Sequence, residues 1–144
     1  MNQPKRNCVL LADRNHGLTE GMRDMLMSAF ETVVMVADEF SLFDSADRME
    51  PNVVAIDLAL ADGDGLALIA RWRIEFPYVR LIVLSLHDDP IVARAVIDAG
   101  ANAFVLKRAI ATDLLDAVET VNRSETFVSP SITGMSGPVG NPVR

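Results

Sequence analysis

Two features of the sequence predict an α/β fold built on a doubly wound, five-stranded parallel sheet. Short apolar runs alternate with longer segments that carry apolar residues at helical spacing. The short runs are apolar at consecutive positions, which is typical of strands buried on both faces by helices. With 144 residues, half of them hydrophobic, the chain has the size and apolar content of one such domain.

The apolar runs and periodic segments give the predicted elements in chain order. Ser41 is expected to cap the second helix and Thr112 the fifth. Pro90 suits the first turn of the fourth helix, and Gly100 suits its C-terminal cap. The predicted strands are 8–12, 33–37, 53–56, 81–84 and 103–106, and the predicted helices are 17–29, 41–49, 65–75, 90–99 and 111–122.

The composition changes from residue 124 onward. Residues 129–144 contain three prolines, three glycines and three serines and have no apolar periodicity. We therefore expect a domain over residues 1–123, followed by a flexible linker or C-terminal tail over 124–144.

Charge and hydropathy exclude several function classes. The formal net charge of −7 argues against direct binding of nucleic acid, which needs an excess of Lys and Arg. The polar start MNQPKRN lacks a signal-peptide pattern, and no apolar run reaches the roughly 18 residues of a membrane span. A cytoplasmic protein without membrane contact is expected.

Chemistry-bearing residues follow four of the five predicted strands. Asp13 follows the first strand, Asp57 the third, Ser85 the fourth and Lys107 the fifth. In a parallel sheet these positions converge on the edge where ligands bind. Two carboxylates, a hydroxyl and an ammonium suit phosphoryl transfer assisted by a hard divalent cation such as Mg²⁺. Each residue alone is weak evidence, because an Asp after a strand is usually a cap or turn residue.

Five segments carry a resemblance to a known family. They are LLADRN at 10–15, VVAIDLALADGDGL at 53–66, LIVLSLHDD at 81–89, AGANAFVLKRA at 99–109 and FVSPSI at 127–132. Over about residues 7–123 the chain resembles response-regulator receiver domains, most closely those of NarL/FixJ-type (LuxR-type) two-component regulators. The resemblance implies a flavodoxin-like, CheY-like (βα)5 fold. It also implies a phosphoacceptor signalling domain that catalyses only its own phosphorylation and is not otherwise an enzyme.

The resemblance assigns roles by position. It makes Asp57 the phosphoacceptor, Lys107 the lysine that contacts the phosphoryl group, and Ser85 the hydroxyl that moves toward it. Phe104 would be the aromatic switch residue whose rotamer follows Ser85; the alternative is a plain core aromatic, because Phe104 lies inside an apolar run.

The expected magnesium site departs from the family pattern. Asp13, Asp57 and the backbone carbonyl of Ala59 are the implied Mg²⁺ ligands, but Arg14 stands where receivers usually have a second acid. A guanidinium cannot bind Mg²⁺ and repels it. Two alternatives stay open: Arg14 pairs with Asp57 or Asp13 and binds the phosphoryl group itself, or it turns into solvent while the two aspartates bind metal weakly.

Two further residues are expected to modulate the site. Leu86 follows Ser85 and narrows access to Asp57, and His87 borders the site or is a solvent-facing loop histidine.

Three functions compete. The first is a receiver that accepts a phosphoryl group from a histidine kinase, forms homodimers, and regulates transcription through a DNA-binding domain outside this chain. The second is a pseudo-receiver, in which Arg14 prevents phosphorylation and the chain acts as an interaction module. The third is a flavodoxin-like enzyme or nucleotide binder, which is disfavoured because LLADRNHG lacks the glycines of a phosphate-binding loop.

Overall fold

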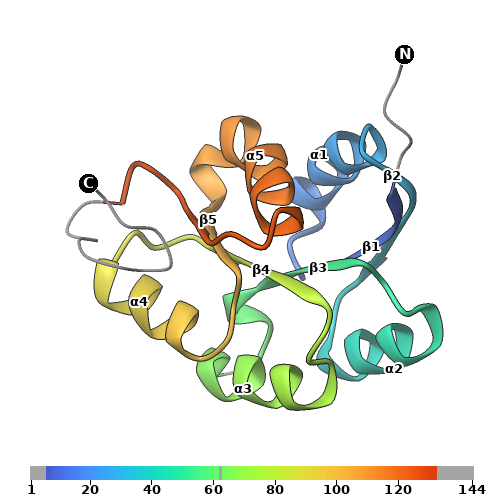
Figure 1. Cartoon of the computed structure of the whole chain (residues 1–144), viewed down its shortest axis with the longest axis horizontal. Helices are drawn as coiled ribbons and strands as arrows, with labels where there is room; N and C mark the ends of the chain where they lie inside the picture. Colours follow the sequence, from blue (N-terminus) through green and yellow to red (C-terminus); the bar gives the residue numbers. More distant parts are fainter. Residues whose placement is uncertain (1–5, 62, 133–144) are drawn as a thin grey trace.

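The computed structural model describes residues 6–61 and 63–132 and has a six-stranded, all-parallel sheet in the order β2-β1-β3-β4-β5-β6. Helices cover both faces of this sheet, with α1 and α5 on one side and α2, α3 and α4 on the other (Figure 1). The doubly wound α/β prediction is confirmed. The strands are β1 (Arg6–Ala12), β2 (Phe30–Val36), β3 (Val53–Asp57), β4 (Arg80–Ser85), β5 (Ala103–Leu106) and β6 (Phe127–Val128).

Five helices connect the strands, and each runs close to its predicted range. They are α1 (His16–Met27), α2 (Glu39–Met49), α3 (Gly65–Glu75), α4 (Pro90–Asp98) and α5 (Ile110–Asn122). Short 3₁₀ turns, Leu58–Leu60 and Lys107–Ala109, follow β3 and β5. In the described part of the chain, no helix is both long and apolar enough to cross a membrane.

The consecutive apolar residues of the strands divide between two cores. In β1, Val9 and Leu11 pack with α1 and α5, whereas Leu10 and Ala12 pack with the helices of the opposite face. Successive side chains of a strand point to opposite faces, so a strand with helices on both sides must be apolar throughout. Each helix returns the chain to the start of the next strand, so all strands run in one direction and end at the same edge.

Two predicted helix caps were wrong. Asp38, not Ser41, caps α2, and its carboxylate accepts the Ser41 backbone N–H at 2.7 Å. Helix α5 starts at Ile110 without a side-chain cap, and the Thr112 hydroxyl donates to the Ala109 carbonyl instead. In both cases the helix begins one or two residues before the predicted start. Pro90 in the first turn of α4 is confirmed.

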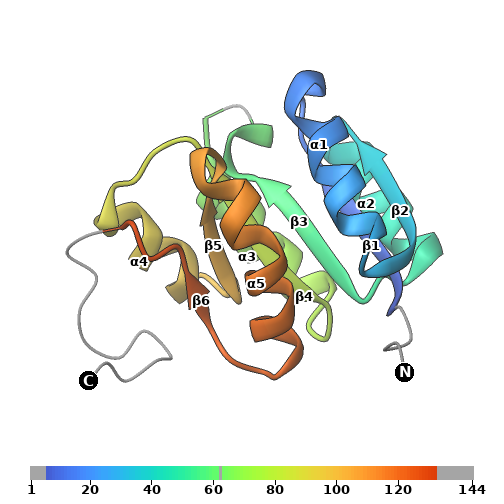
Figure 2. The same ribbon diagram turned by 90° about the horizontal axis from the view of Figure 1, so that it is seen from above.

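The predicted number of five strands is also corrected, because β6 lies inside the segment 124–144 that was predicted as a linker or tail. Strand β6 pairs with β5 in parallel, Ala103 with Phe127 and Phe104 with Val128, and Figure 2 shows it beside β5. A strand of two residues has no detectable periodicity, and a proline follows it shortly, so no local pattern predicts it. Residues 133–144 lie outside the described part of the chain, and the domain division at residue 123 stays a prediction.

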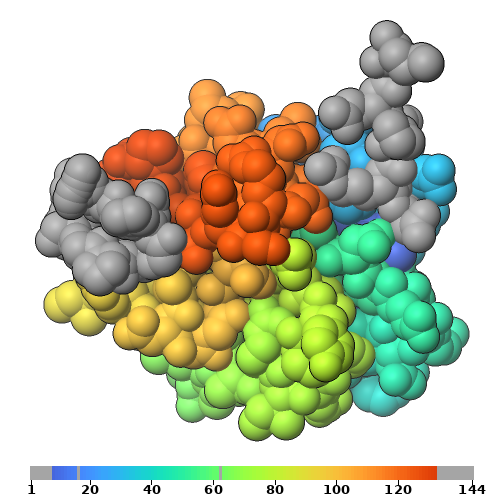
Figure 3. Space-filling model, in the orientation of Figure 1, coloured from blue at the N-terminus to red at the C-terminus, as the bar shows by residue number. Residues whose placement is uncertain are grey.

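The residues after β6 continue along the domain rather than away from it. The Ser129 N–H donates to the Phe104 carbonyl at 3.0 Å, and the Ile132 N–H donates to the Ser129 carbonyl at 3.0 Å. Ile132 is 7% exposed and joins the core on the α2–α4 side. In the space-filling view the red surface of this segment adjoins the orange surface of α5 (Figure 3).

Candidate functional site

Four strands end in polar residues at one edge of the sheet. Ala12 pairs with Ile56 and Asp57 with Leu84, which places Asp13 and Asp57 at neighbouring strand ends. Ser85 pairs with Leu106, so the hydroxyl lies beside the end of β5, where Lys107 follows. Asp13, Asp57, Ser85 and Lys107 are all buried. The structure therefore brings the four predicted residues to one place.

Lys107 forms ion pairs with both aspartates. Its Nζ lies 2.7 Å from Asp13 Oδ2 and 3.2 Å from Asp57 Oδ2, and its side chain is 3% exposed. The other carboxylate oxygens accept backbone N–H groups: Asn15 donates to Asp13 Oδ1 at 2.8 Å, and Ala59 donates to Asp57 Oδ1 at 3.2 Å. Two carboxylates share one ammonium, which leaves one negative charge in excess at this edge.

The charge balance affects the pKa of Asp57. Burial raises this pKa above its ordinary value of 3.8, and the neighbouring Asp13 carboxylate raises it further. The Ala59 N–H and the Lys107 ammonium oppose the rise, but the net direction is upward. Asp57 is thus a carboxylate that is held in a partly dry, negatively charged setting, a condition common at reactive sites.

Asp57 and Ser85 line an open pocket of about 550 Å³, together with Ala59 and residues of the following loops. Leu86 and His87 also line it, and both are exposed at its mouth. The Ser85 hydroxyl donates to the His87 carbonyl at 3.1 Å and accepts the His87 N–H at 3.0 Å. In this arrangement the hydroxyl is engaged by its own loop.

Phe104 lies next to this edge but inside the core. Its side chain is fully buried, and it packs in the cluster on the α2–α4 side of the sheet. This position fits a core aromatic, and the switch role of Phe104 stays a prediction.

Arg14 extends across the loop that follows β3. Its Nη2 donates to the Leu60 carbonyl at 2.7 Å, while the residue as a whole is exposed. The backbone and hydroxyl of Ser41 lower the pKa of Asp38, and Arg14 adds a smaller effect in the same direction. The guanidinium thus ties the end of β1 to the segment just after Asp57, a contact that neither sequence-based alternative included.

The described residues do not form a ready-made set of side-chain ligands for a divalent cation. Within residues 6–61 and 63–132, no group of three or more His, Cys, Asp or Glu gathers closely enough to hold a metal. Each of the four carboxylate oxygens of Asp13 and Asp57 already has a protein N–H or ammonium within 3.2 Å. A cation would have to share these oxygens with Lys107 and would lie beside a loop that already carries the Arg14 guanidinium.

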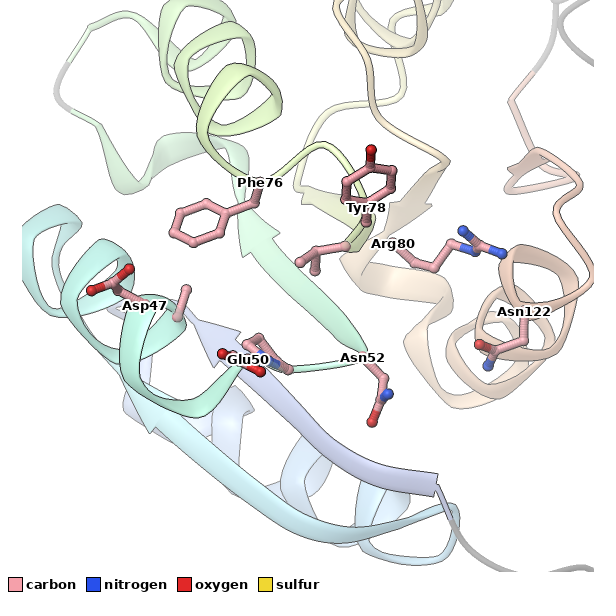
Figure 4. A pocket seen from close by; sticks show the side chains of 10 residues that line it. Asp47, Glu50, Asn52, Phe76, Tyr78, Arg80 and Asn122 are labelled. Atoms are coloured by element: carbon pink, nitrogen blue, oxygen red, sulfur yellow. The ribbon is translucent and has the colours of Figure 1, made fainter.

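A second, larger pocket lies at the opposite end of the strands and has a volume of about 610 Å³ (Figure 4). Two of its polar side chains, Arg80 and Asn52, are already used by the fold. Arg80 donates to the Val121 carbonyl at 2.7 Å and to Ser124 Oγ at 2.9 Å, and Asn52 Oδ1 accepts the Cys8 N–H at 3.0 Å. The chemistry-bearing cluster is therefore at the smaller pocket.

A family model for the response regulator receiver domain matches residues 9–119. The chain belongs to this family. The match covers β1 through most of α5 and includes all four residues of the cluster. Receiver domains of this family are signalling domains that generally bind Mg²⁺ at the phosphorylation site.

Similar receivers occur in transcriptional regulators of the LuxR type. The oxygen regulatory protein NreC of Staphylococcus carnosus is 29% identical over 129 residues, which are 87% of this chain but 59% of NreC. The isolated receiver of RcsB from Salmonella enterica serovar Typhimurium with the phosphomimetic BeF₃⁻ aligns with a TM-score of 0.82 and 26% identity, over 91% of this chain and 99% of that one. A structure of two RcsB dimers bound to two parallel DNAs aligns at 0.80 and 25%, over 93% and 72%.

Two contacts beside the candidate site were not part of the sequence-based prediction. Arg108 Nη2 lies 2.9 Å from Asp88 Oδ2 and bridges the loops after β5 and β4, but exposed charges of this kind look like ordinary surface residues in a sequence. Asn15 holds Asp13 through its N–H and caps α1 through its side chain. An Asn just before a helical pattern is a recognisable cap signal, so this second role could have been predicted.

Proposed function

We propose that the chain accepts a phosphoryl group on Asp57 and transmits a signal through the change in conformation that follows. The observation that carries the proposal is the pairing of Asp13 and Asp57 with one buried ammonium, Lys107, while Asp57 also lines an open pocket. A purely structural ion pair would need one carboxylate for the lysine. The second carboxylate makes this edge negative, and burial together with the neighbouring Asp13 raises the pKa of Asp57, which does not stabilise the fold.

The proposed step is an in-line transfer. A carboxylate oxygen of Asp57 forms a bond to phosphorus, while the bond from phosphorus to the donor atom breaks and its electron pair leaves with the donor. Lys107 stays beside the phosphoryl oxygens and offsets their charge. Ser85 exchanges its hydrogen bond to the His87 carbonyl for one to a phosphoryl oxygen. Leu86 and His87 modulate access at the mouth of the pocket.

The donor and the output are proposed from the relatives. A histidine kinase is the proposed source of the phosphoryl group, and regulation of transcription is the proposed output. The chain spans only 59% of NreC, and RcsB binds DNA as dimers. With a net charge of −7, this chain is proposed to reach DNA only through another domain of a longer regulator, as a cytoplasmic homodimer.

A pseudo-receiver is the second candidate, and one observation favours it. Arg14 is bonded to the Leu60 carbonyl beside the site, where its charge opposes a divalent cation. In this case Asp57 would stay unmodified, and the receiver would act through its surfaces in a single state.

Intact mass after incubation with acetyl phosphate, with and without Mg²⁺, separates the two candidates. A gain of about 80 Da per chain that disappears in Asp57→Ala and persists in Asp24→Ala supports phosphorylation at Asp57. Asp24 is the matched control because it is an exposed aspartate on α1. No gain in the parent chain, together with a Mg²⁺-dependent gain in Arg14→Asp, would establish the pseudo-receiver.

A further inference from the structure

Residues 127–132, called the C-terminal strap below, contact the end of β5 beside the candidate site through one buried side chain. The Ser129 hydroxyl accepts the Leu106 backbone N–H at 2.9 Å, and Ser129 is 1% exposed. Leu106 is the last residue of β5, and Lys107 follows it directly. The hydrogen bond therefore lies one residue before the lysine that clamps Asp13 and Asp57.

This side-chain hydrogen bond replaces one backbone hydrogen bond of the β5–β6 ladder. The Phe127 N–H donates to the Asn102 carbonyl, and the Ser129 N–H donates to the Phe104 carbonyl, as in a regular parallel ladder. In the next step of such a ladder, the Ser129 carbonyl would accept the Leu106 N–H. That carbonyl instead accepts the Ile132 N–H in a turn, and the Ser129 side chain takes over the amide.

The Ser129 hydroxyl satisfies this amide, and the burial of Leu106 makes that hydrogen bond important. Leu106 is fully buried, so an unpaired N–H there would lose its hydrogen bond without gaining one to water. On the opposite edge of β5, Leu106 pairs with Ser85 of β4. The end of β5 is therefore held on one side by the strand that carries Ser85 and on the other by Ser129.

We propose that Ser129 is a positioning residue for the phosphoryl site, and that through it the C-terminal strap and Lys107 stabilise each other's position. The part of this proposal that concerns phosphorylation rests on the proposed function of Asp57. With the strap docked, the end of β5 holds Lys107 Nζ within 3.2 Å of both carboxylates. Coupling of this kind is reciprocal, so a change at Lys107 alters the docking of the strap, and release of the strap alters Lys107.

The variants Ser129→Ala, Ser129→Thr and Ser131→Ala test the proposal. Ser131 is the matched control because it lies in the same strap and is exposed. In Ser129→Ala we expect hydrogen exchange of the Leu106 amide to become about 5- to 30-fold faster, and phosphorylation by acetyl phosphate to slow about fivefold. In Ser131→Ala we expect the Leu106 exchange rate and the phosphorylation rate to equal those of the parent chain. In Ser129→Thr, which keeps the hydroxyl, we expect both rates to lie closer to the parent values than in Ser129→Ala.

The outcomes separate a positioning role from a structural one. Faster exchange at Leu106 with an unchanged phosphorylation rate would make Ser129 a structural cap only and would overturn the proposal. Exchange rates in the α1 amides, measured in the same samples, show whether a variant has merely lost global stability.

A second arm does not depend on phosphorylation. In Lys107→Met we expect the Ser129 and Ile132 amides to exchange faster than in the parent chain, relative to the amides of α1. Unchanged exchange in the strap would refute the coupling. If the parent chain takes no phosphoryl group, the proposed function of Asp57 fails, and this arm still decides whether the strap and Lys107 are coupled.

Discussion

Replacement of Lys107 by Met removes the ammonium at the centre of the candidate site and keeps most of the side-chain volume. Two buried carboxylates, Asp13 and Asp57, then face each other without a counter-charge. In the parent chain, Lys107 Nζ lies 2.7 Å from Asp13 Oδ2 and 3.2 Å from Asp57 Oδ2. With an effective dielectric constant of about 20, the Coulomb attractions lost are roughly 6 kcal/mol for Asp13 and roughly 5 kcal/mol for Asp57, before desolvation is counted. Most of this is offset because the ammonium no longer has to be buried. The expected net loss is about 3–5 kcal/mol in the free energy of unfolding, as for other buried ion pairs that lose one partner.

Urea denaturation followed by Trp72 fluorescence measures this loss. Trp72 is fully buried and packs against Phe43 and Phe76, whose ring centroids are 5.4 and 4.3 Å away, so its emission reports global unfolding. Arg108→Met is the matched control, since the neighbouring Arg108 makes a solvent-exposed ion pair and should cost less than about 1 kcal/mol.

A double variant identifies the cause of the loss. If the unpaired carboxylates are responsible, adding Asp57→Asn to Lys107→Met recovers on the order of 1–2 kcal/mol, which is a non-additive effect between contacting residues. The reasoning is refuted if Lys107→Met costs no more than Arg108→Met, or if Asp57→Asn lowers stability further in the Lys107→Met background.

Three other predictions follow from the same structure. Asp57→Asn should raise the free energy of unfolding by on the order of 1 kcal/mol at pH 7, because the raised pKa means that the ionised carboxylate destabilises the folded state. Between pH 3.8 and the raised pKa of Asp57, the folded state binds a proton on this carboxyl more readily than the unfolded state does. The stability gain of Asp57→Asn over the parent chain should therefore vanish as the pH falls from 7 toward 3.8. An equal gain at pH 7 and near pH 3.8 would contradict this cause. Gly100→Ala should lower the free energy of unfolding by more than about 1 kcal/mol, since φ at Gly100 is +123° and a Cβ would lie 3.0 Å from Arg73 Cγ. Gly21→Ala, at a position in α1 with open space around it, should instead raise the free energy of unfolding by about 0.5–1 kcal/mol. Thermal unfolding of the two variants tests both expectations. Millimolar Mg²⁺ should raise the melting temperature of Arg14→Asp but not that of the parent chain, and an equal rise in both would show that Arg14 does not oppose the cation.

Much of the fold was predictable because it depends on local patterns. The consecutive apolar runs identified five strands, and the helical spacing identified five helices, since a layer buried on both faces requires these patterns along the chain. The caps at Asp38 and Ala109 and the two-residue strand β6 were not predicted. The start of α2 depends on the Asp38 side chain turning back to the helix, and α5 starts without any side-chain cap. Strand β6 exists only because the edge of β5 is available to pair with it.

The sequence by itself determined which residues end the strands, and hence that Asp13, Asp57, Ser85 and Lys107 meet at one edge. This follows from strand polarity alone, because all carboxyl ends of a parallel sheet lie on the same side. Only the tertiary structure decided how these residues pair: Lys107 with both aspartates, Ser85 with its own loop, Arg14 with the Leu60 carbonyl and Ser129 with the Leu106 amide. The physical reason is that such pairings depend on strand order, register and rotamers, which join residues up to 94 positions apart and leave no local pattern in the chain.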